Sequence, residues 1–302
     1  MLSQVQREGL KSLNRTELRD LGLLYRQIST DLSTVRSDPA STQQARYLNQ
    51  LLGRAHNSIY IGRKRSINTV LEFYWRAYPR IFRRLLPYTL TATALFAVGA
   101  IGGAFVTLSH PEFMRSFLGP NMVDTIERHE MWTHSILSIK PQASSRIMTN
   151  NMSVAFTTFA AGITAGIGTI YMLFFNGLML GVIGSACWLS DMSLQLWSFV
   201  APHGVLELPA IFIAGGAGLR LAQALLFPGL LSRRDSLAAG GSESVQLLVG
   251  VIPMLFVAGL IEAFISPSSL PVSLKFFLGA ISLLSLLSYL ARGFPVTPGS
   301  AP

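Results

Sequence analysis

The stretch FVAPHGVLELPAIF, residues 199–212, places His203 and Glu207 four residues apart in a segment that is otherwise apolar. Positions i and i+4 lie on one face of a helix, so the two side chains would point the same way. The apolar surroundings favour a helix in lipid, where an ionisable side chain needs a partner. The rest of the sequence must supply that partner.

The composition is typical of an integral membrane protein. Half of the 302 residues are hydrophobic, 13% are charged, and the mean hydropathy is +0.44, whereas a soluble domain has about 25% charged residues. Cys187 is the single cysteine, so no internal disulfide can form, and no Cys/His cluster has the spacing of a metal site. The first long apolar run begins only after residue 84, which predicts that there is no cleavable signal peptide.

Positive charge is concentrated ahead of the apolar part. Residues 1–85 contain 15 Lys/Arg and 6 Asp/Glu, a net charge of 15 − 6 = +9, whereas residues 86–302 contain 9 of each and sum to zero. Basic residues beside membrane spans stay on the cytoplasmic side. We therefore expect a cytoplasmic N-terminus that contacts anionic lipid headgroups. Nucleic acid is not an expected partner, because no base-reading motif accompanies the charge.

Six hydrophobic segments approach the roughly 20 residues that a helix needs to cross a bilayer. Their expected bounds are 87–108, 150–168, 170–190, 204–227, 245–266 and 273–291. Six crossings return the C-terminus to the cytoplasm and leave the basic loop 227–244 on the same side. The predicted fold is therefore all-α: a polytopic bundle of about six transmembrane helices in residues 86–302, preceded by a basic, cytoplasmic helical region in residues 1–85.

The sequence of residues 1–85 predicts three helical segments. Apolar residues recur at three- and four-residue steps over 16–35 and 40–60, which predicts a helical hairpin that turns at Pro39. The segment 66–86 mixes aromatic residues with arginines, which is typical of a helix lying in the headgroup layer or leading into the first span. After the first span, residues 122–137 are expected to form a helix on the outer surface.

The region 150–190 is a nearly continuous apolar run that is rich in glycine. Either two spans meet at a turn near Gly168, or helices break inside the membrane, which lipid tolerates only where the backbone is buried in protein or wet. Three pairs of glycines have the GxxxG spacing that lets helix backbones approach closely: Gly99/Gly103, Gly162/Gly166 and Gly177/Gly181. Close packing is favoured over a transport path built from broken helices.

The expected topology assigns a depth to each polar residue in the spans. An outer layer would contain His203, Glu207, Glu262, Asn150 and Asn151. An inner layer would contain Asn176, Arg220 and Thr169. We expect His203 and Glu207 to tie the outer end of the fourth span to members of the outer layer, because a charge at this depth costs about 2.5–3.5 kcal/mol unless it is paired or neutralised. If the two glutamates face one another, one of them should hold a proton.

A catalytic or metal-binding role for His203 and Glu207 is a weaker interpretation than a structural role. His203 and Glu207 supply two of the three or four ligands that a metal needs, and they lack the HExxH pattern of zinc proteases. No serine nucleophile elbow accompanies them. We therefore predict no catalytic residues, no metal and no cofactor. Passage of protons or a solute is the second interpretation, since intramembrane acids often mark pathways, and an intramembrane metal-dependent enzyme is the third.

Seven stretches of the sequence together point to a known family. They are YLNQLLGRAH (47–56), IY (59–60), NN (150–151), FAAGITAGIGT (159–169), NGLMLG (176–181), PHGVLELPAIFIAGGAGLRLA (202–222) and GLIEAFISP (259–267). In this order they resemble the stage II sporulation protein M family of multi-span bacterial membrane proteins. The resemblance implies a helical N-terminal region before the spans and a place in the bacterial cytoplasmic (inner) membrane. The resemblance also implies two kinds of partner. The sporulation member of the family organises peptidoglycan-degrading proteins, and other members are commonly encoded beside an AAA-type ATPase.

We therefore predict a cell-envelope scaffold that is not an enzyme and that recruits partners to the membrane. The candidate partners are membrane lipids, other membrane or envelope proteins, and an AAA-type ATPase encoded nearby. The sporulation role itself is not carried over, and no oligomeric state is predicted.

Overall fold

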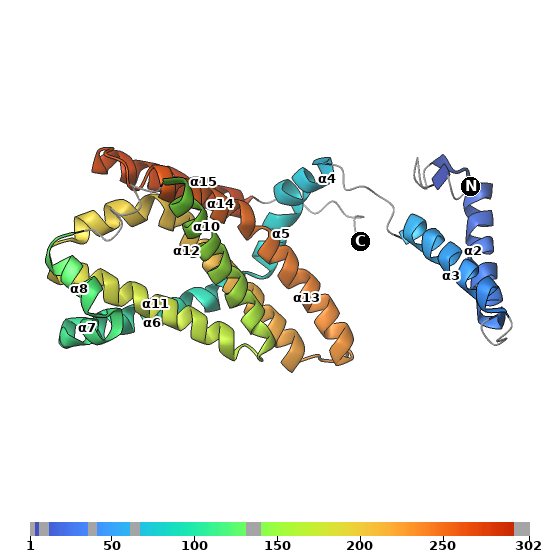
Figure 1. Cartoon of the computed structure of the whole chain (residues 1–302), viewed down its shortest axis with the longest axis horizontal. Helices are drawn as coiled ribbons and strands as arrows, with labels where there is room; N and C mark the ends of the chain where they lie inside the picture. Colours follow the sequence, from blue (N-terminus) through green and yellow to red (C-terminus); the bar gives the residue numbers. More distant parts are fainter. Residues whose placement is uncertain (1–3, 6–11, 36–40, 61–66, 131–139, 293–302) are drawn as a thin grey trace. The chain divides into compact units, whose positions relative to one another are not determined.

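The computed structural model describes residues 4–5, 12–35, 41–60, 67–130 and 140–292. The regular structure in these stretches is entirely helical, which confirms the predicted all-α class (Figure 1). The chain divides into two compact units between Leu71 and Glu72.

The first unit contains a helical hairpin. Its helices α2 (Arg15–Val35) and α3 (Thr42–Tyr60) pack against each other. A capping box begins α2: the Asn14 side-chain oxygen accepts a hydrogen bond from the Glu17 amide at 2.9 Å, and the Glu17 carboxylate accepts one from the Asn14 amide at 2.8 Å. The helices predicted over 16–35 and 40–60 are thus present, with ends shifted by one or two residues.

The second unit is a bundle of helices. Within the described residues, five helices are long and apolar enough to cross a membrane. They are α6 (Leu86–Ser109), α11 (Ile167–Leu189), α12 (Ser193–Leu226), α13 (Arg233–Val249) joined to α14 (Val251–Phe264), and α15 (Val272–Ala291). A membrane-spanning helical bundle is therefore confirmed.

The remaining predicted span, 150–168, is replaced by a longer helix. This helix, α10 (Lys140–Ala160), is not among the five, because its first half is mostly polar. A short 3-10 turn, η4 (Ala161–Ile163), follows it, and the chain reverses at Gly166, whose φ of +85° suits a residue without a Cβ. The region 150–190 thus contains two helices joined by a turn a few residues ahead of Gly168.

Pairs of contacts show the direction in which α10 runs. Asn151 of α10 contacts Glu207 of α12, and eleven residues later in each segment Gly162 lies against Gly218. The two helices are therefore parallel. At about 1.5 Å per residue the shared path is roughly 16 Å, so α10 carries the chain back along α12 before α11 turns to run the other way.

The joined helices α13 and α14 run antiparallel to α12. Near the end of α12, Arg220 pairs with Glu243 of α13, and near its middle Glu207 shares a hydrogen-bonding partner with Glu262 of α14. Arg84, just before α6, also pairs with Glu243. The start of α6, the end of α12 and the start of α13 therefore lie at one end of the bundle, which we call the basic end.

The helices around α12 begin earlier than two of the predicted boundaries. The span expected over 204–227 begins at Ser193, so Pro209 lies inside the helix and not in its first turn. A proline in a membrane helix is tolerated because neighbouring groups satisfy the freed carbonyl. The loop expected over 227–244 is helical from Arg233 onward, and Ser232 caps that helix by accepting a hydrogen bond from the Asp235 amide at 3.1 Å.

Short helices follow α6 at the other end of the bundle. They are α7 (Glu112–Leu118) and α8 (Pro120–Glu127). Arg115 joins them through bonds of 2.7 Å to each of Asp124 and Glu127. The Asp124 hydrogen bond and the Glu127 charge raise the pKa of the Arg115 guanidinium. The sequence predicts a helix over 122–137. Residues 131–137 of that segment lie outside the described residues.

The segment 66–86 leads directly into the first span, which is one of the two outcomes expected for it, and from Phe73 onward it packs on the bundle. It consists of α4 (Ile67–Glu72), a π-helical turn η3 (Phe73–Ala77) and α5 (Tyr78–Arg84). Tyr78 is fully buried in the main apolar core, stacks on Tyr289 with ring centroids 6.3 Å apart, and leaves no room for a side chain at Gly250. The second unit therefore begins at Glu72, whereas the expected boundary was 85/86.

Glycines bring α6 and α11 into backbone contact. A Cβ at Gly177 would overlap the carbonyl oxygen of Phe96, and one at Gly181 would overlap that of Ala100. Gly99 and Gly103 face the backbone of α11 in the same way. The GxxxG interpretation thus holds for these two pairs, while Gly162 contacts α12 and Gly166 makes the turn.

Replacing Gly181 by alanine should force α6 and α11 apart. Overpacking of this kind costs about 1–3 kcal/mol, so we expect a lower melting temperature for the purified chain in detergent micelles. Gly102→Ala is the matched control, because a Cβ at Gly102 meets nothing within 4 Å. Equal melting temperatures for the two variants would contradict the backbone contact.

Candidate functional site

One polar cluster joins α10, α12 and α14 inside the bundle. The Asn151 side-chain amide donates hydrogen bonds to Glu207 at 2.8 Å and to Glu262 at 3.1 Å. The structure thus brings together three of the five residues predicted for the outer layer. The pairing has a physical reason, since a carboxylate within an apolar bundle needs hydrogen-bond donors.

His203 completes the cluster one turn before Glu207 on α12. Its ring is buried, with 7% of the side chain exposed, and Nδ1 lies 2.9 Å from the Ser266 hydroxyl. Its Nε2 lies 4.0 Å from Glu262 Oε1, which is too long for a hydrogen bond. His203, Glu207 and Glu262 each offer one ligand atom, and these three atoms lie within 4.8 Å of one another.

Two members of this site were missed by sequence reasoning. Ser266 follows α14 and bonds His203, and Lys275 of α15 donates from Nζ to the Ser266 carbonyl at 2.7 Å. Lys275 was the detectable one, because it is the single charged residue in the last span. Ser266 carried no signal, since serines are frequent in membrane helices and only the fold places this one beside the ring.

Asn150 lies beside the cluster and not in it. Its side chain is exposed, and it donates a hydrogen bond of 3.4 Å to Asn151. The difference from Asn151 follows from the helix, because neighbouring residues point about 100° apart.

The residue types His203, Ser266 and Glu262 are those of a hydrolase triad, but their geometry is not. The histidine and the glutamate do not reach hydrogen-bond distance, and Ser266 is only 1% exposed, so a substrate would have no access to its hydroxyl. Holding a cation, sharing protons and cross-linking helices are the chemical roles that this arrangement can perform.

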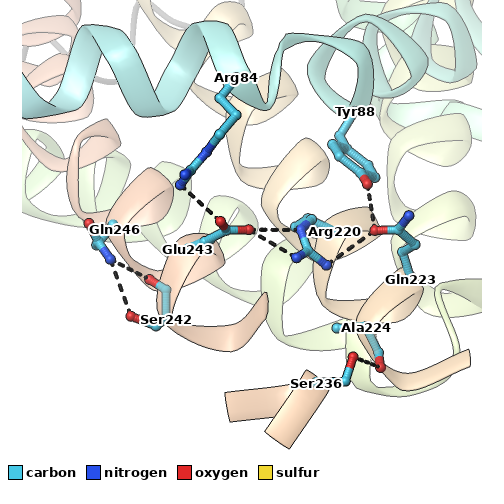
Figure 2. Close-up of polar contacts among 9 residues, drawn as sticks. All are labelled: Arg84, Tyr88, Arg220, Gln223, Ala224, Ser236, Ser242, Glu243 and Gln246. Carbon is cyan, nitrogen blue, oxygen red and sulfur yellow. Dashed lines mark hydrogen bonds and ion pairs between the residues drawn. The ribbon is translucent and has the colours of Figure 1, made fainter. Parts of the chain in front are cut away.

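A second network lies at the basic end of the bundle (Figure 2). Glu243 of α13 accepts bonds from Arg220 Nε at 3.0 Å and Nη2 at 2.9 Å, and it pairs with Arg84 at 2.9 Å. Arg220 also bonds Gln223 at 3.1 Å, and the Tyr88 hydroxyl donates to the same Gln223 oxygen. Arg220 is therefore paired within the protein and does not depend on lipid phosphate.

The other two residues predicted for an inner layer do not join this network. Asn176 donates to the Met172 carbonyl of its own helix, and the buried Thr169 hydroxyl donates to the Thr158 carbonyl, both at 2.7 Å. The layer is thus not one cluster. Depth along a span can be read from the sequence, but the direction in which a side chain points depends on how the helices are rotated.

The fold and these buried polar groups define a polytopic helical membrane protein. Comparison with known proteins then identifies the family: residues 92–267, more than half of the chain, match the stage II sporulation protein M family, and the chain belongs to it. Residues 2–61 separately match a domain of unknown function.

An uncharacterised protein of Methanocaldococcus jannaschii is 30% identical over 123 residues, which cover 40% of this chain and 69% of that protein. No solved structure matches the chain. All four residues of the Asn151, His203, Glu207 and Glu262 cluster lie inside the part that matches the family.

Removing Glu243 should leave Arg220 without its charge partner. Because their side chains are only 25% and 19% exposed, we expect Glu243→Ala to cost about 1–3 kcal/mol, between the values for surface and buried pairs. The double variant Arg220→Met/Glu243→Met should regain part of this stability, as judged by melting temperature in micelles. A double variant as unstable as the sum of both single changes would show that the pair is not coupled.

Proposed function

We propose that this protein is a membrane-embedded recruiting component of a cell-envelope complex. In this proposal the bundle is the anchor, and the hairpin of the first unit binds a partner. The observation that carries it is a face of α2 on which exposed arginines surround an exposed leucine. The separate match of residues 2–61 to a domain family supports the view that this unit is a module of its own.

The face is defined by its spacing along α2. At about 100° per residue, Arg15, Arg19, Leu23 and Arg26 fall within an arc of roughly 80°, and all four side chains are exposed. The acidic residues Glu17, Asp20 and Asp31 fall outside this arc. Opposite charges are thus separated around the helix.

Charge complementarity selects the partner. Residues 1–71 contain 11 Lys/Arg and 5 Asp/Glu, a net charge of 11 − 5 = +6. We therefore propose that the face binds an acidic surface of a cytoplasmic protein, with Leu23, 48% exposed, as its apolar contact. A single exposed leucine is ordinary on a protein surface, so the arginines that surround Leu23 carry the proposal. An AAA-type ATPase encoded nearby is the candidate that the family resemblance offers.

The same reasoning orients the bundle, for which we propose the bacterial cytoplasmic membrane with both termini inside. Arg83, Arg84 and Arg233 all lie at the basic end, and Arg83 bonds the Arg292 carbonyl after the last span. Because basic residues are retained in the cytoplasm, the basic end is assigned to the cytoplasmic side.

The orientation can be tested by cysteine labelling in a Cys187→Ser background. A cysteine at the fully exposed Leu230 should react with a membrane-impermeant maleimide only in inside-out vesicles. A cysteine at the exposed Asn121 of α8 should react only in intact spheroplasts. Labelling of both positions from the same side would contradict the orientation.

Recruitment can be tested with a photo-crosslinking residue at position 23 of the full chain in native membranes. We expect one protein adduct, which mass spectrometry identifies as a soluble protein with an acidic surface. The adduct should fall at least fivefold when Arg19 and Arg26 are both changed to glutamate, because opposite charge would then be repelled. The matched control carries the crosslinker at Asp31, exposed on the acidic side of α2. Lipid adducts alone at position 23 would overturn the proposal in favour of headgroup binding.

Transport is the weaker candidate for a specific reason. Between Glu207 and Arg220, α12 presents the sequence LPAIFIAGGAGL, which contains no polar side chain over about 20 Å of helix. The two polar networks are thus separated along α12 by apolar and glycine residues. A flux of protons or solute in proteoliposomes that Glu207→Gln abolishes would favour transport instead.

A further inference from the structure

We propose that His203, Glu207 and Glu262 bind one divalent transition-metal ion, for which Zn²⁺ is the best fit. In this site Asn151 and Ser266 act as positioning residues that orient the ligands. The site lies within the bundle and is independent of the recruiting face on α2.

The fold supplies the third ligand that the sequence lacked. His203 and Glu207 lie one turn apart on α12, and α14 adds Glu262, so that three ligand atoms lie within 4.8 Å of one another. Zinc bonds of about 2.0–2.1 Å place tetrahedral ligands roughly 3.3 Å apart, so the side chains must close by at most roughly 1.5 Å. Rotation about the glutamate side-chain bonds covers that distance.

The histidine is held in the orientation that a metal ligand requires. Metal-binding histidines use the second ring nitrogen in a hydrogen bond, which fixes the ring and its tautomer. Here Nδ1 bonds the Ser266 hydroxyl at 2.9 Å, which directs Nε2 toward Glu262. The gap of 4.0 Å between Nε2 and the carboxylate is too long for a direct bond and leaves space for a cation between them.

Among the residues that the structure describes, the two carboxylates inside the bundle, Glu207 and Glu262, have no lysine or arginine as a partner. The nearby Lys275 ammonium bonds the Ser266 carbonyl instead. Ionised carboxylates in such a place are stable only when they are paired, protonated or bound to a metal. One divalent ion would balance both charges.

Asn151 prepares the carboxylates for a shared ligand. Its amide donates to Oε2 of each glutamate, at 2.8 and 3.1 Å, which leaves the other oxygen of each carboxylate available. One imidazole and two carboxylates suit Zn²⁺ better than Mg²⁺, which prefers oxygen ligands and water. With three protein ligands, a tetrahedral ion would keep a fourth position for water.

The experiment measures metal binding by the full chain purified in detergent without chelator. We expect about one Zn²⁺ per chain by elemental analysis, and after chelation we expect Zn²⁺ to rebind with a 1:1 stoichiometry that a thousandfold excess of Mg²⁺ does not displace. Co²⁺ added to the stripped chain should give a visible d–d spectrum. A stripped wild-type chain that binds neither Zn²⁺ nor Co²⁺ overturns the proposal and leaves a cluster that shares protons.

Variants separate ligands from positioning residues. Glu262→Gln and His203→Gln should weaken Zn²⁺ binding at least 100-fold, whereas Asn151→Ala should weaken it about 10-fold, as outer-shell changes do. The matched control is His110→Gln/Glu112→Gln, which removes an exposed histidine–carboxylate pair 3.3 Å apart and should leave binding unchanged. Equal affinities in wild type and Glu262→Gln would overturn the assignment. Because the wild-type titration needs no variant, failure of a variant to fold does not remove the test.

Discussion

The structure depends on how one helix, α12, satisfies its buried polar and charged side chains inside an apolar bundle. It carries His203 and Glu207 toward one end and Arg220 toward the other. Glu262 and Glu243, which meet them, lie on the continuous segment formed by α14 and α13. Because an unpaired charge is costly in this environment, the two sets of contacts fix the register of α12 against its antiparallel neighbour, and the intervening apolar core packs accordingly.

Glycine sets the second constraint, which is the distance between backbones. The seam between α6 and α11 contains four glycines that each face backbone atoms of the other helix. Packing in lipid gains little from burying apolar surface, since lipid is itself apolar, and therefore relies on such close contact. The polar clusters thus determine which side chains of neighbouring helices contact each other, and the glycines determine how closely the helix backbones approach.

The two polar networks of the bundle have different chemistry. At the basic end, Arg84 and Arg220 both pair with Glu243, so its single negative charge is fully balanced. In the other cluster two carboxylates share the Asn151 amide, the His203 imidazole bonds the Ser266 hydroxyl, and no arginine among the described residues joins them. The first arrangement is complete in itself. In the second, no lysine or arginine of the described residues pairs with the carboxylates, which is why the metal proposal concerns that cluster alone.

Composition and hydrophobic length by themselves determined that this is an all-α membrane protein, because lipid admits few other folds. They also placed Asn151, Glu207 and Glu262 at a similar depth, since depth follows from position along a span. Tertiary structure alone decided which residues at one depth face each other: it brought Ser266 and Lys275 to the cluster and left Asn176 and Thr169 with other partners. Tertiary contacts also hold residues 233–249 as a helix on α12, although this segment is only weakly apolar. Arg220 pairs with Glu243, and the Ser236 hydroxyl donates a hydrogen bond to the Ala224 carbonyl. The sequence showed only the start of this helix, in the SRRD cap at 232–235. Those contacts join residues far apart in the chain, and periodicity within one segment carries no information about them.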